Sequence, residues 1–452
     1  MLENYSAKIK KALKGINIGD RISITKVNQI YEGLLMPRSE IGDENCIVLK
    51  LDSGYNIGVR FEGKMKIEKS KKAEPRGIKE EIKFEEGKEK IEKIKFDVKK
   101  PKVSLIMTGG TIVSKIDYRT GGVFALERPE ELLTNIPELK DIAFIKDIKV
   151  PFKKMSEDLD FKDWQKLAQT VAKEINENQG VVITHGTDTL HFTSAALSFM
   201  LKNLSKPVVL TGSQRSSDRG SSDAFMNIVC SAHAALSDIA EVGTCMHATT
   251  DDHYCYFIRG TKVRKMHSTR RDAFRSINEM PLAKIYPNGK IDVMNENHKR
   301  RSDEKVIADI KFEPKVALLK AYPGSEPEIL EFLVKKGYKG FVVEGTGMGH
   351  VPTFADKSWI PAIKKLTKDG IPVVIAPQTI YGRINTDVYT NLRIFYHDAK
   401  AIPAEDMLSE VAYVKLGWLL AHYKDIEDIR KMMLTNMAGE ITKRSELDTF
   451  LV

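Results

Sequence analysis

Hydroxyl and glycine residues cluster at the ends of several short apolar runs in this chain of 452 residues. The runs VSLIM, VVIT, PVVLT and GFVVEG lead into four turns: TGGT (108–111), HGTDT (185–189), GSQR (212–215) and TGMG (346–349). In open parallel sheets, ligands bind outside the carboxyl ends of the strands. We therefore expect the four turns to gather at one sheet edge and to form a small-molecule site.

The first turn could hold either a nucleophile or a helix cap. Gly109 and Gly110 would let the backbone approach a ligand and leave its amides free, which suits a carboxylate or a developing oxyanion. Thr111 would then present its hydroxyl at the mouth of the site. A tight turn with a capping threonine, or a phosphate nest, fits the same residues and is favoured for this turn alone. A dinucleotide fingerprint would need three spaced glycines, and this turn has an adjacent pair.

The second turn carries adjacent Thr187 and Asp188, followed by the helical pattern LHFTSAALSFM. Asp188 could be the N-cap of that helix, which is the favoured interpretation of the aspartate by itself. It could also bind the α-amino group of an amino acid, or orient a base beside Thr187. His185 directly follows a buried strand, where a packed and hydrogen-bonded histidine is as common as a general base, so we assign it no catalytic role.

The elements that must position these turns are short β-branched runs alternating with amphipathic helical stretches such as FKDWQKLAQTVAKEINEN. Continuous apolar runs are typical of strands buried on both faces, and strand–helix alternation predicts a doubly wound, mostly parallel α/β sheet. The charged stretch 295–305 would join a larger α/β domain, residues 100–305, to a smaller one, residues 310–452. The larger domain would hold the catalytic residues.

The first 85 residues have a different pattern. Short strand-like segments separated by turn residues predict a small SH3-like β-barrel, and a Lys- and Glu-rich linker follows it up to about residue 102. So small a barrel cannot enclose a deep catalytic pocket. We therefore expect it to act in docking.

Composition limits the class of protein. The net charge of +9 suits a polyanion such as RNA as well as it suits an ordinary enzyme. No apolar run is long enough to cross a bilayer, and four cysteines without CxxC spacing predict a cytoplasmic protein. The pattern C-x-H…H-x-C, formed by Cys245, His247, His253 and Cys255, matches no standard zinc motif, so we predict no metal.

TGGTI followed by HGTDT resembles the bacterial-type asparaginase and glutaminase family, over about residues 102–425. The resemblance implies that Thr111 is the usual nucleophile and that Tyr118, on a mobile loop, hydrogen-bonds it. It also implies a second cluster of Thr187, Asp188 and Lys265. The expected reaction is hydrolysis of a carboxamide through a covalent acyl-enzyme with release of ammonia.

The resemblance also implies a set of substrate-binding residues. The segment Met155–Asp158 is similar to the family's substrate-carboxylate loop, and Glu157 stands where glutamine is common. We expect the following residues to bind substrate: Gly110, Ser156, Glu157 and Gly186.

The proton acceptor remains open at this point. Lys265 can act as a base only if its ammonium is partly neutral, which desolvation or cationic neighbours would favour. Arg264, Arg270 and Arg271 are such neighbours in sequence, whereas Asp188 would favour the charged form; Tyr118 is the alternative acceptor. The surrounding basic stretch, RGTKVRKMHSTRRDAFR, is either a solvated loop or a phosphate contact, and charge alone favours the loop.

The small barrel, linker and core together resemble the D-subunit family of archaeal glutamyl-tRNA(Gln) amidotransferases. HGTDTLHFTSAALSF, TGSQRSSDRGSSDAFMN and VRKMHSTRRDAFRSIN carry this resemblance. It implies that the chain hydrolyses glutamine, with no cofactor of its own. Ammonia would pass to a separate E subunit, which uses ATP and magnesium to amidate Glu-tRNA(Gln). Two D and two E subunits would assemble, with D dimerising through its asparaginase core.

Three functions are therefore considered. The first is the glutaminase subunit, which would be weakly active alone and strongly active with its partner and tRNA. The second is a stand-alone cytosolic L-asparaginase. The third is a non-enzymatic tRNA-binding or scaffold protein, which the complete set of candidate catalytic residues argues against. The first is favoured.

Overall fold

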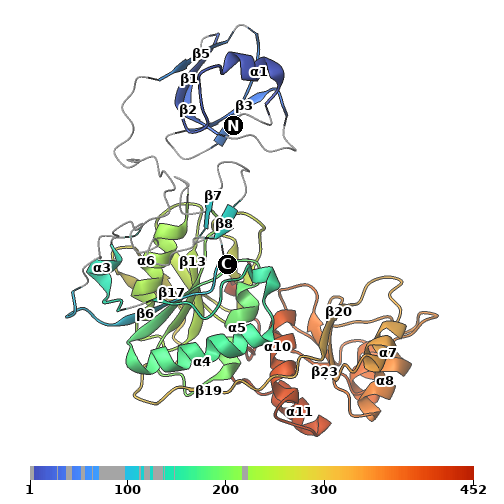
Figure 1. Ribbon diagram of the computed structural model, residues 1–452. Coiled ribbons are helices and arrows are strands. Elements are labelled where there is room, and N and C mark those ends of the chain that lie inside the picture. Colours follow the sequence, from blue (N-terminus) through green and yellow to red (C-terminus); the bar gives the residue numbers. More distant parts are fainter. Residues whose placement is uncertain are drawn as a thin grey trace.

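The computed structural model describes residues 5–27, 29–36, 43–51, 56–63, 65–70, 97–110, 114–116, 123–125, 136, 138–146, 148–215 and 222–451. Thr111 and Tyr118 lie outside these residues. Figure 1 shows the arrangement of the described elements along the chain.

The N-terminal part is a five-stranded antiparallel sheet in the order β4-β3-β2-β1-β5, with a short helix α1 (Ala7–Ala12). Its strands are β1 (Arg21–Lys26), β2 (Gln29–Leu35), β3 (Cys46–Lys50), β4 (Asn56–Arg60) and β5 (Lys66–Lys69). Ile22 and Ile24 alternate with more exposed neighbours along β1 and pack with Ile9 and Leu13 of the helical segment. An antiparallel N-terminal sheet is therefore confirmed, and its closure into an SH3-like barrel stays a prediction.

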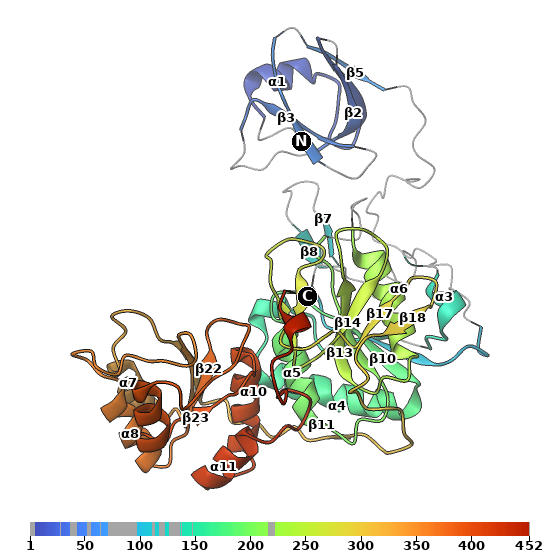
Figure 2. The ribbon, with the colours of Figure 1, turned by 180° about the vertical axis from the view of Figure 1, so that it is seen from behind.

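The larger α/β part is built on an eight-stranded sheet in the order β18-β17-β14-β13-β12-β10-β6-β9. Strands β6 (Val103–Met107), β9 (Ile148–Lys149), β10 (Gly180–Thr184), β12 (Val208–Thr211) and β13 (Val242–His247) pair in parallel. Strands β14 (Cys255–Arg259), β17 (Ala283–Ile285) and β18 (Ile291–Val293) continue the sheet antiparallel; Figure 2 shows them from behind.

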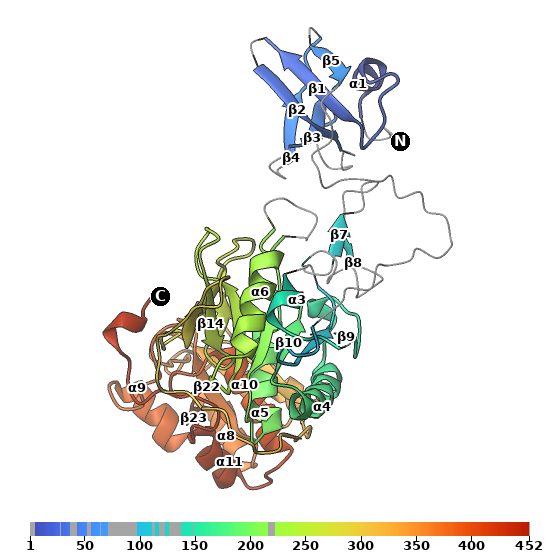
Figure 3. The same ribbon diagram turned by 90° about the vertical axis from the view of Figure 1, so that its left-hand side faces the viewer.

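Helices cover both faces of this sheet. Ile183 of β10 packs in one core with α4 (Phe161–Glu177) and α5 (Leu190–Met200). Val182, its neighbour in the same strand, packs in the opposite core with α6 (Ala224–Ala235) and α3 (Leu139–Ile142). Figure 3 shows α4 and α3, one helix from each of the two cores. Because successive strand side chains point to opposite faces, this two-sided burial explains why the strands are continuously apolar.

The smaller part is a four-stranded parallel sheet of β20 (Val316–Lys320), β21 (Gly340–Gly345), β22 (Val373–Pro377) and β23 (Ile402–Pro403). Its helices are α7 (Glu328–Lys335), α8 (Ile360–Lys368), α9 (Thr390–Arg393), α10 (Ser409–Leu420) and α11 (Ile426–Met433). Helix α10 contacts both α5 of the larger part and β21 of the smaller sheet. The predicted α/β class, with two sheets after an N-terminal β unit, is confirmed.

Short elements complete the described chain. Three two-stranded ladders pair β7 (Ser114–Ile116) with β8 (Val123–Ala125), β11 (Leu201–Lys202) with β19 (Ile307–Ala308), and β15 (Val263–Lys265) with β16 (Phe274–Ser276). Single turns of helix lie at η2 (Ser156–Asp158), η3 (Ile394–Asp398) and η4 (Leu447–Thr449). Within the described residues, we find no helix with the length and apolar character needed to span a bilayer.

One sequence prediction is wrong at this level. The TGMG turn follows β21, which belongs to the four-stranded sheet, whereas the other three turns follow β6, β10 and β12 of the eight-stranded sheet. Only three of the four turns therefore share a sheet edge. Both kinds of strand are buried and parallel, so their sequence patterns do not reveal which sheet each strand joins.

Candidate active site

Parallel pairing brings three turns to the same level of the sheet. In β10, Thr184 is paired with Met107 of β6 on one side and with Thr211 of β12 on the other. The ladder continues one step further, since the Thr108 amide donates to the Thr184 carbonyl (3.1 Å) and the His185 amide to the Thr211 carbonyl (2.8 Å). The three turns therefore leave the sheet side by side.

Glycines then allow these turns to touch through their backbones. A Cβ atom added to Gly110 would lie 2.4 Å from the backbone nitrogen and Cα of Gly186. One on Gly186 would lie 2.7 Å from the Cβ of Ser156, and one on Gly212 would lie 2.9 Å from the Cγ2 of Thr187. Gly110 also has a positive φ of 86°, where a side chain is strained. Three of the four predicted substrate-binding residues are thus brought together: Gly110, Ser156 and Gly186.

The fourth, Glu157, lies in the single turn η2 beside Ser156, and its side chain is exposed. Ser156 itself is buried, and its carbonyl accepts a hydrogen bond from the Thr189 hydroxyl at 2.6 Å. This bond ties the 155–158 loop to the second turn. The N-cap residue of helix α5 is Thr189 and not Asp188. The structure therefore does not support the interpretation of Asp188 as the helix cap.

Lys265 enters the site from the β15–β16 hairpin, which is not part of the main sheet. Its ammonium donates to the Thr187 hydroxyl oxygen at 2.9 Å and pairs with the Asp188 carboxylate at 2.6 Å. Thr187 is 7% exposed, whereas the Asp188 side chain is 65% exposed. The structure therefore brings together a shielded hydroxyl, an amine and a solvated carboxylate, as the resemblance implied.

The arginines near Lys265 are each occupied by a carboxylate. Arg264 pairs with Glu410, Arg270 with Asp272 and Arg271 with Asp252, at 2.5, 2.7 and 2.8 Å. Their charges are therefore offset locally, while Lys265 itself contacts Asp188. The solvated-loop interpretation of the basic stretch holds only for residues 266–270, which are exposed, whereas Arg259 and Lys262 are buried in ion pairs.

His185 is a packed histidine, which supports leaving it out of the catalytic set. Its Nδ1 lies 2.7 Å from the Gly186 carbonyl, and its Nε2 lies 2.9 Å from the Thr193 hydroxyl. The Trp164 indole N–H donates to the same hydroxyl at 3.1 Å. Burial lowers the pKa of His185 to about 4. A neutral imidazole that donates from Nδ1 to the Gly186 carbonyl can accept at Nε2 from the Thr193 hydroxyl, which in turn accepts from Trp164. His185 therefore has a structural role in the second turn.

The third turn is held by a carboxylate that sequence reasoning missed. Asp223, fully buried before α6, accepts from the backbone amides of Gln214 (3.0 and 3.1 Å) and Arg215 (3.1 Å). Asn227, four residues later, donates to Asp223 at 3.0 Å and to the Gly212 carbonyl at 2.9 Å. Burial raises the pKa of Asp223 despite these bonds. An aspartate and an asparagine at i and i+4 on an apolar helix were the available signal.

The zinc-like cysteine and histidine pattern is divided between the core and an exposed loop. Cys245, His247 and Cys255 are fully buried, whereas His253 lies exposed in a loop. The two ring nitrogens of His247 contact Asn227 (2.6 Å) and Asp252 (2.9 Å). Within the part of the chain that the structure describes, no group of three metal-binding side chains is found.

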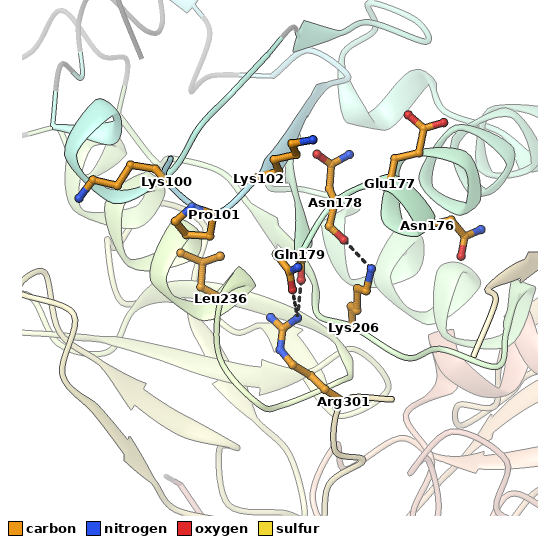
Figure 4. Close-up of a pocket in the computed structure, with 10 residues that line it drawn as sticks. All are labelled: Lys100, Pro101, Lys102, Asn176, Glu177, Asn178, Gln179, Lys206, Leu236 and Arg301. Atoms are coloured by element: carbon orange, nitrogen blue, oxygen red, sulfur yellow. Dashed lines mark hydrogen bonds between the residues drawn. The ribbon is translucent and has the colours of Figure 1, made fainter. Parts of the chain in front are cut away.

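A hollow of about 730 Å³ lies at the opposite edge of the sheet, where the strands begin. Figure 4 shows its lining residues, among them Lys206 and Arg301. Lys206 donates to the carbonyls of Ile175 and Asn178 at the end of α4, and Arg301 donates to the Ala235 carbonyl at the end of α6. These cations stabilise helix C-termini. The hollow is therefore separate from the candidate active site.

Known protein families match three segments of this chain. Residues 102–299 match the description "Asparaginase, N-terminal", and residues 315–433 match "Glutaminase/Asparaginase C-terminal domain". Residues 16–69 match "GatD N-terminal domain".

Curated relatives cover nearly the whole chain. The glutamyl-tRNA(Gln) amidotransferase D subunit of Pyrococcus abyssi is 50% identical over 446 residues, covering 97% of this chain and 98% of the relative. The protein of the same name from Methanothermobacter thermautotrophicus is 44% identical over 450 residues, covering 99% of each.

Solved structures match about three quarters of the chain. The thermostable L-asparaginase from Thermococcus kodakarensis matches with a TM-score of 0.68 and 32% identity, over 75% of this chain and 99% of that one. L-asparaginase I from Vibrio cholerae matches with a TM-score of 0.66 and 27% identity, over 76% and 99%.

Proposed function

The chain belongs to the family of glutamyl-tRNA(Gln) amidotransferase D subunits, and from this premise we propose that it is the subunit that hydrolyses glutamine. The ammonia released would convert Glu-tRNA(Gln) to Gln-tRNA(Gln). The observation that carries the proposal is the contact of Lys265 with both Thr187 and Asp188 at the carboxyl edge of the larger sheet.

The proposed chemistry has two halves. A threonine hydroxyl attacks the carboxamide carbon of glutamine, the C–N bond breaks, and the nitrogen leaves as ammonia after gaining a proton. Water then attacks the ester and releases glutamate. We propose Thr111 as the nucleophile with Tyr118 beside it, on the motif resemblance, since both residues lie outside the described part of the chain.

Thr187, Asp188 and Lys265 would form the second catalytic group. In the second half of the reaction the Thr187 hydroxyl would orient the attacking water, Lys265 would hold that hydroxyl by donating to it, and Asp188 would orient the Lys265 amine. Backbone amides of the touching turns, including Gly110 and Gly186, would bind the oxyanion. Ser156 and Glu157 would bind the amino-acid end of the substrate. We propose that this chain needs no cofactor of its own for this chemistry.

The proposal includes a division of labour within a complex. A family named as one component of an amidotransferase implies a partner, and we propose a separate E subunit that activates the tRNA-bound glutamate with ATP and magnesium in the cytoplasm. We propose two D and two E subunits, with the D chains dimerising through the asparaginase core. Exposed apolar side chains on the smaller part support a protein contact there: Tyr322, Phe332, Phe354, Val388 and Tyr389.

We further propose three domains: residues 1–85 as a small β domain with its linker, 100–305 as the catalytic α/β domain, and 310–452 as the smaller α/β domain. The solved asparaginases match about three quarters of this chain. The N-terminal domain is therefore the natural candidate for a role specific to the amidotransferase, namely docking.

The test is ammonia release from glutamine and from asparagine by the purified chain, alone and with the E subunit and Glu-tRNA(Gln). Glutamine hydrolysis that rises strongly only in the full mixture supports the proposed function. Rapid asparagine hydrolysis that needs no partner would instead support a stand-alone L-asparaginase, the function named for the structures with the same core.

A further inference from the structure

A buried carboxylate from the smaller part of the molecule reaches the larger part close to the candidate site. Glu410, in the first turn of α10, is 4% exposed. Its Oε1 lies 2.5 Å from the Arg264 guanidinium and 3.5 Å from the His191 Nε2. Burial by itself would raise the pKa of Glu410, but the bond from His191 and the charge of Arg264 lower it below its ordinary value.

These two partners lie on the two elements that carry the Lys265 cluster. Arg264 directly precedes Lys265 in β15, and His191 stands in the first turn of α5, three residues after Asp188. The Glu410 Oε1 thus connects two elements of the site. One is strand β15, which carries Lys265, and the other is helix α5, which directly follows Thr187 and Asp188. Ser409 supports it, because its hydroxyl lies 3.3 Å from the other Glu410 oxygen and 2.7 Å from Glu344 of β21.

The hairpin that carries Lys265 needs such support. Strand β15 is three residues long and forms a two-stranded ladder with β16, so in the described chain it is not hydrogen-bonded into the eight-stranded sheet. Thr187 follows a central strand of that sheet. The position of Lys265 relative to Thr187 therefore depends on side-chain contacts between the hairpin and α5, and Glu410 contacts both.

We infer that Glu410 is a positioning residue for the proposed glutaminase reaction, through which the smaller domain holds Lys265 in register with Thr187 and Asp188. This inference rests on the proposed function. Glu410 acts through Arg264 and His191, and it has no contact with the Lys265 ammonium in the structure. A displacement of about 1 Å at a reacting group can reduce a rate about 100-fold.

The test is the Glu410→Gln variant of the full chain, assayed for ammonia release in whichever mixture makes the wild-type chain most active. We expect kcat to fall about 10- to 100-fold with KM within about threefold, because the residue positions a catalytic group and leaves substrate contacts in place. Glu410→Asp should recover part of the loss. A kcat within about twofold of wild type in Glu410→Gln would overturn the inference.

A matched control separates positioning from loss of stability. Glu440 pairs with Lys415 of the same helix at 2.6 Å, and both side chains are fully buried. Glu440→Gln should lower the Tm, yet leave kcat within about twofold, because the hydrogen bonds of this pair go neither to β15 nor to α5. If Glu440→Gln lowers kcat as much as Glu410→Gln does, the effect is general destabilisation and the inference fails.

A double-mutant comparison tests the route. Arg264→Gln removes the other end of the same contact and is expected to lower kcat by a similar factor. Because the two residues act as one unit, the double variant should be no slower than the slower single variant. Multiplied effects in the double variant would overturn the route through Arg264. An inactive wild-type chain in every mixture would be a different result, since it would contradict the proposed function itself.

Discussion

Two turns of this protein have similar sequences and unlike surroundings. The HGTDT turn follows β10 of the larger sheet, and the TGMG turn follows β21 of the smaller sheet. Both have a threonine and glycine after a buried parallel strand. Yet Thr187 is 7% exposed and contacts Lys265, whereas Thr346 is exposed and its hydroxyl lies 3.4 Å from the carbonyl of His350 in its own turn.

The difference teaches that a hydroxyl after a strand becomes a reactive group only through its neighbours. Three turns close around Thr187 because glycines allow backbone contact, and a separate hairpin supplies an amine. The TGMG turn closes on itself through an antiparallel bridge between Thr346 and His350. The same residue types therefore serve a proposed reaction in one place and a local turn in the other.

The largest effect is expected when the Thr187 hydroxyl or the Lys265 amine is removed, since these groups distinguish the HGTDT turn from the TGMG turn. Thr187→Val and Lys265→Ala should each lower ammonia release by about 1,000-fold, because each removes part of one proposed catalytic group. Thr346→Val, in the matched turn, should leave the rate within about twofold. Circular dichroism would show that all three variants remain folded. Wild-type rates in a folded Thr187→Val or Lys265→Ala variant would remove that residue from the mechanism.

The second prediction concerns the glycines of the two turns. Gly110→Ala should lower the free energy of unfolding by about 4 kcal/mol, because the new Cβ would overlap the Gly186 backbone and the positive φ adds strain. Gly347→Ala also meets a positive φ, but the nearest neighbour of its Cβ would be the His350 Nδ1 at 3.8 Å, an ordinary contact distance. We expect a loss of about 1 kcal/mol there. Denaturant unfolding of both variants measures the difference, and equal losses would contradict the close-contact argument.

These contrasts show how much the sequence could predict. The buried strands, the α/β class and the turns after β6, β10 and β12 all follow from local patterns of apolar residues, glycine and threonine. Lys265 lies 78 positions from Thr187 in sequence, and it was predicted only through the family resemblance. No local pattern identifies such a pair.

Long-range contacts set the limit of sequence reasoning here. Glu410 lies in an apolar helix of the smaller part, where a single glutamate gives no sign of an ion pair with Arg264. The sheet to which β21 belongs was predicted wrongly for a related reason, since strand pairing depends on the whole topology. Asp223 could have been predicted from the sequence, because an aspartate directly before the start of a helix is a local signal.

The third prediction uses the pH dependence of stability. The folded-state pKa of His185 is lowered from 6.5 to about 4 by burial, so between these values the unfolded chain binds more protons than the folded one. The stability contributed by the neutral imidazole is complete above pH 6.5. It is lost as the pH falls towards 4, by roughly 3 kcal/mol.

The measurement compares the wild-type chain with His185→Gln. Glutamine keeps hydrogen-bonding capacity at this position without titrating, so the variant should lose less stability than wild type between pH 7 and pH 4. Denaturant midpoints at several pH values, with m-values to confirm a common transition, give the comparison. Parallel curves for the two proteins would show that His185 does not set this part of the pH dependence.

The smallest effect is expected when the lysine–carboxylate pair near the TGMG turn is removed. Each turn lies near a lysine–carboxylate pair: Lys265–Asp188 at 2.6 Å, and Lys320–Glu344 at 3.3 Å at the end of β20 and β21. The Lys320 side chain is 56% exposed. Exposed pairs contribute about 0–1 kcal/mol, so Lys320→Ala should change the free energy of unfolding by less than about 1 kcal/mol and leave ammonia release unchanged. In the Lys265 pair the lysine itself donates to a shielded hydroxyl, that of Thr187, whereas in the Lys320 pair the carboxylate of Glu344 accepts from Ser409. A loss of activity in Lys320→Ala would show that the lysine–hydroxyl contact is not what separates the two turns.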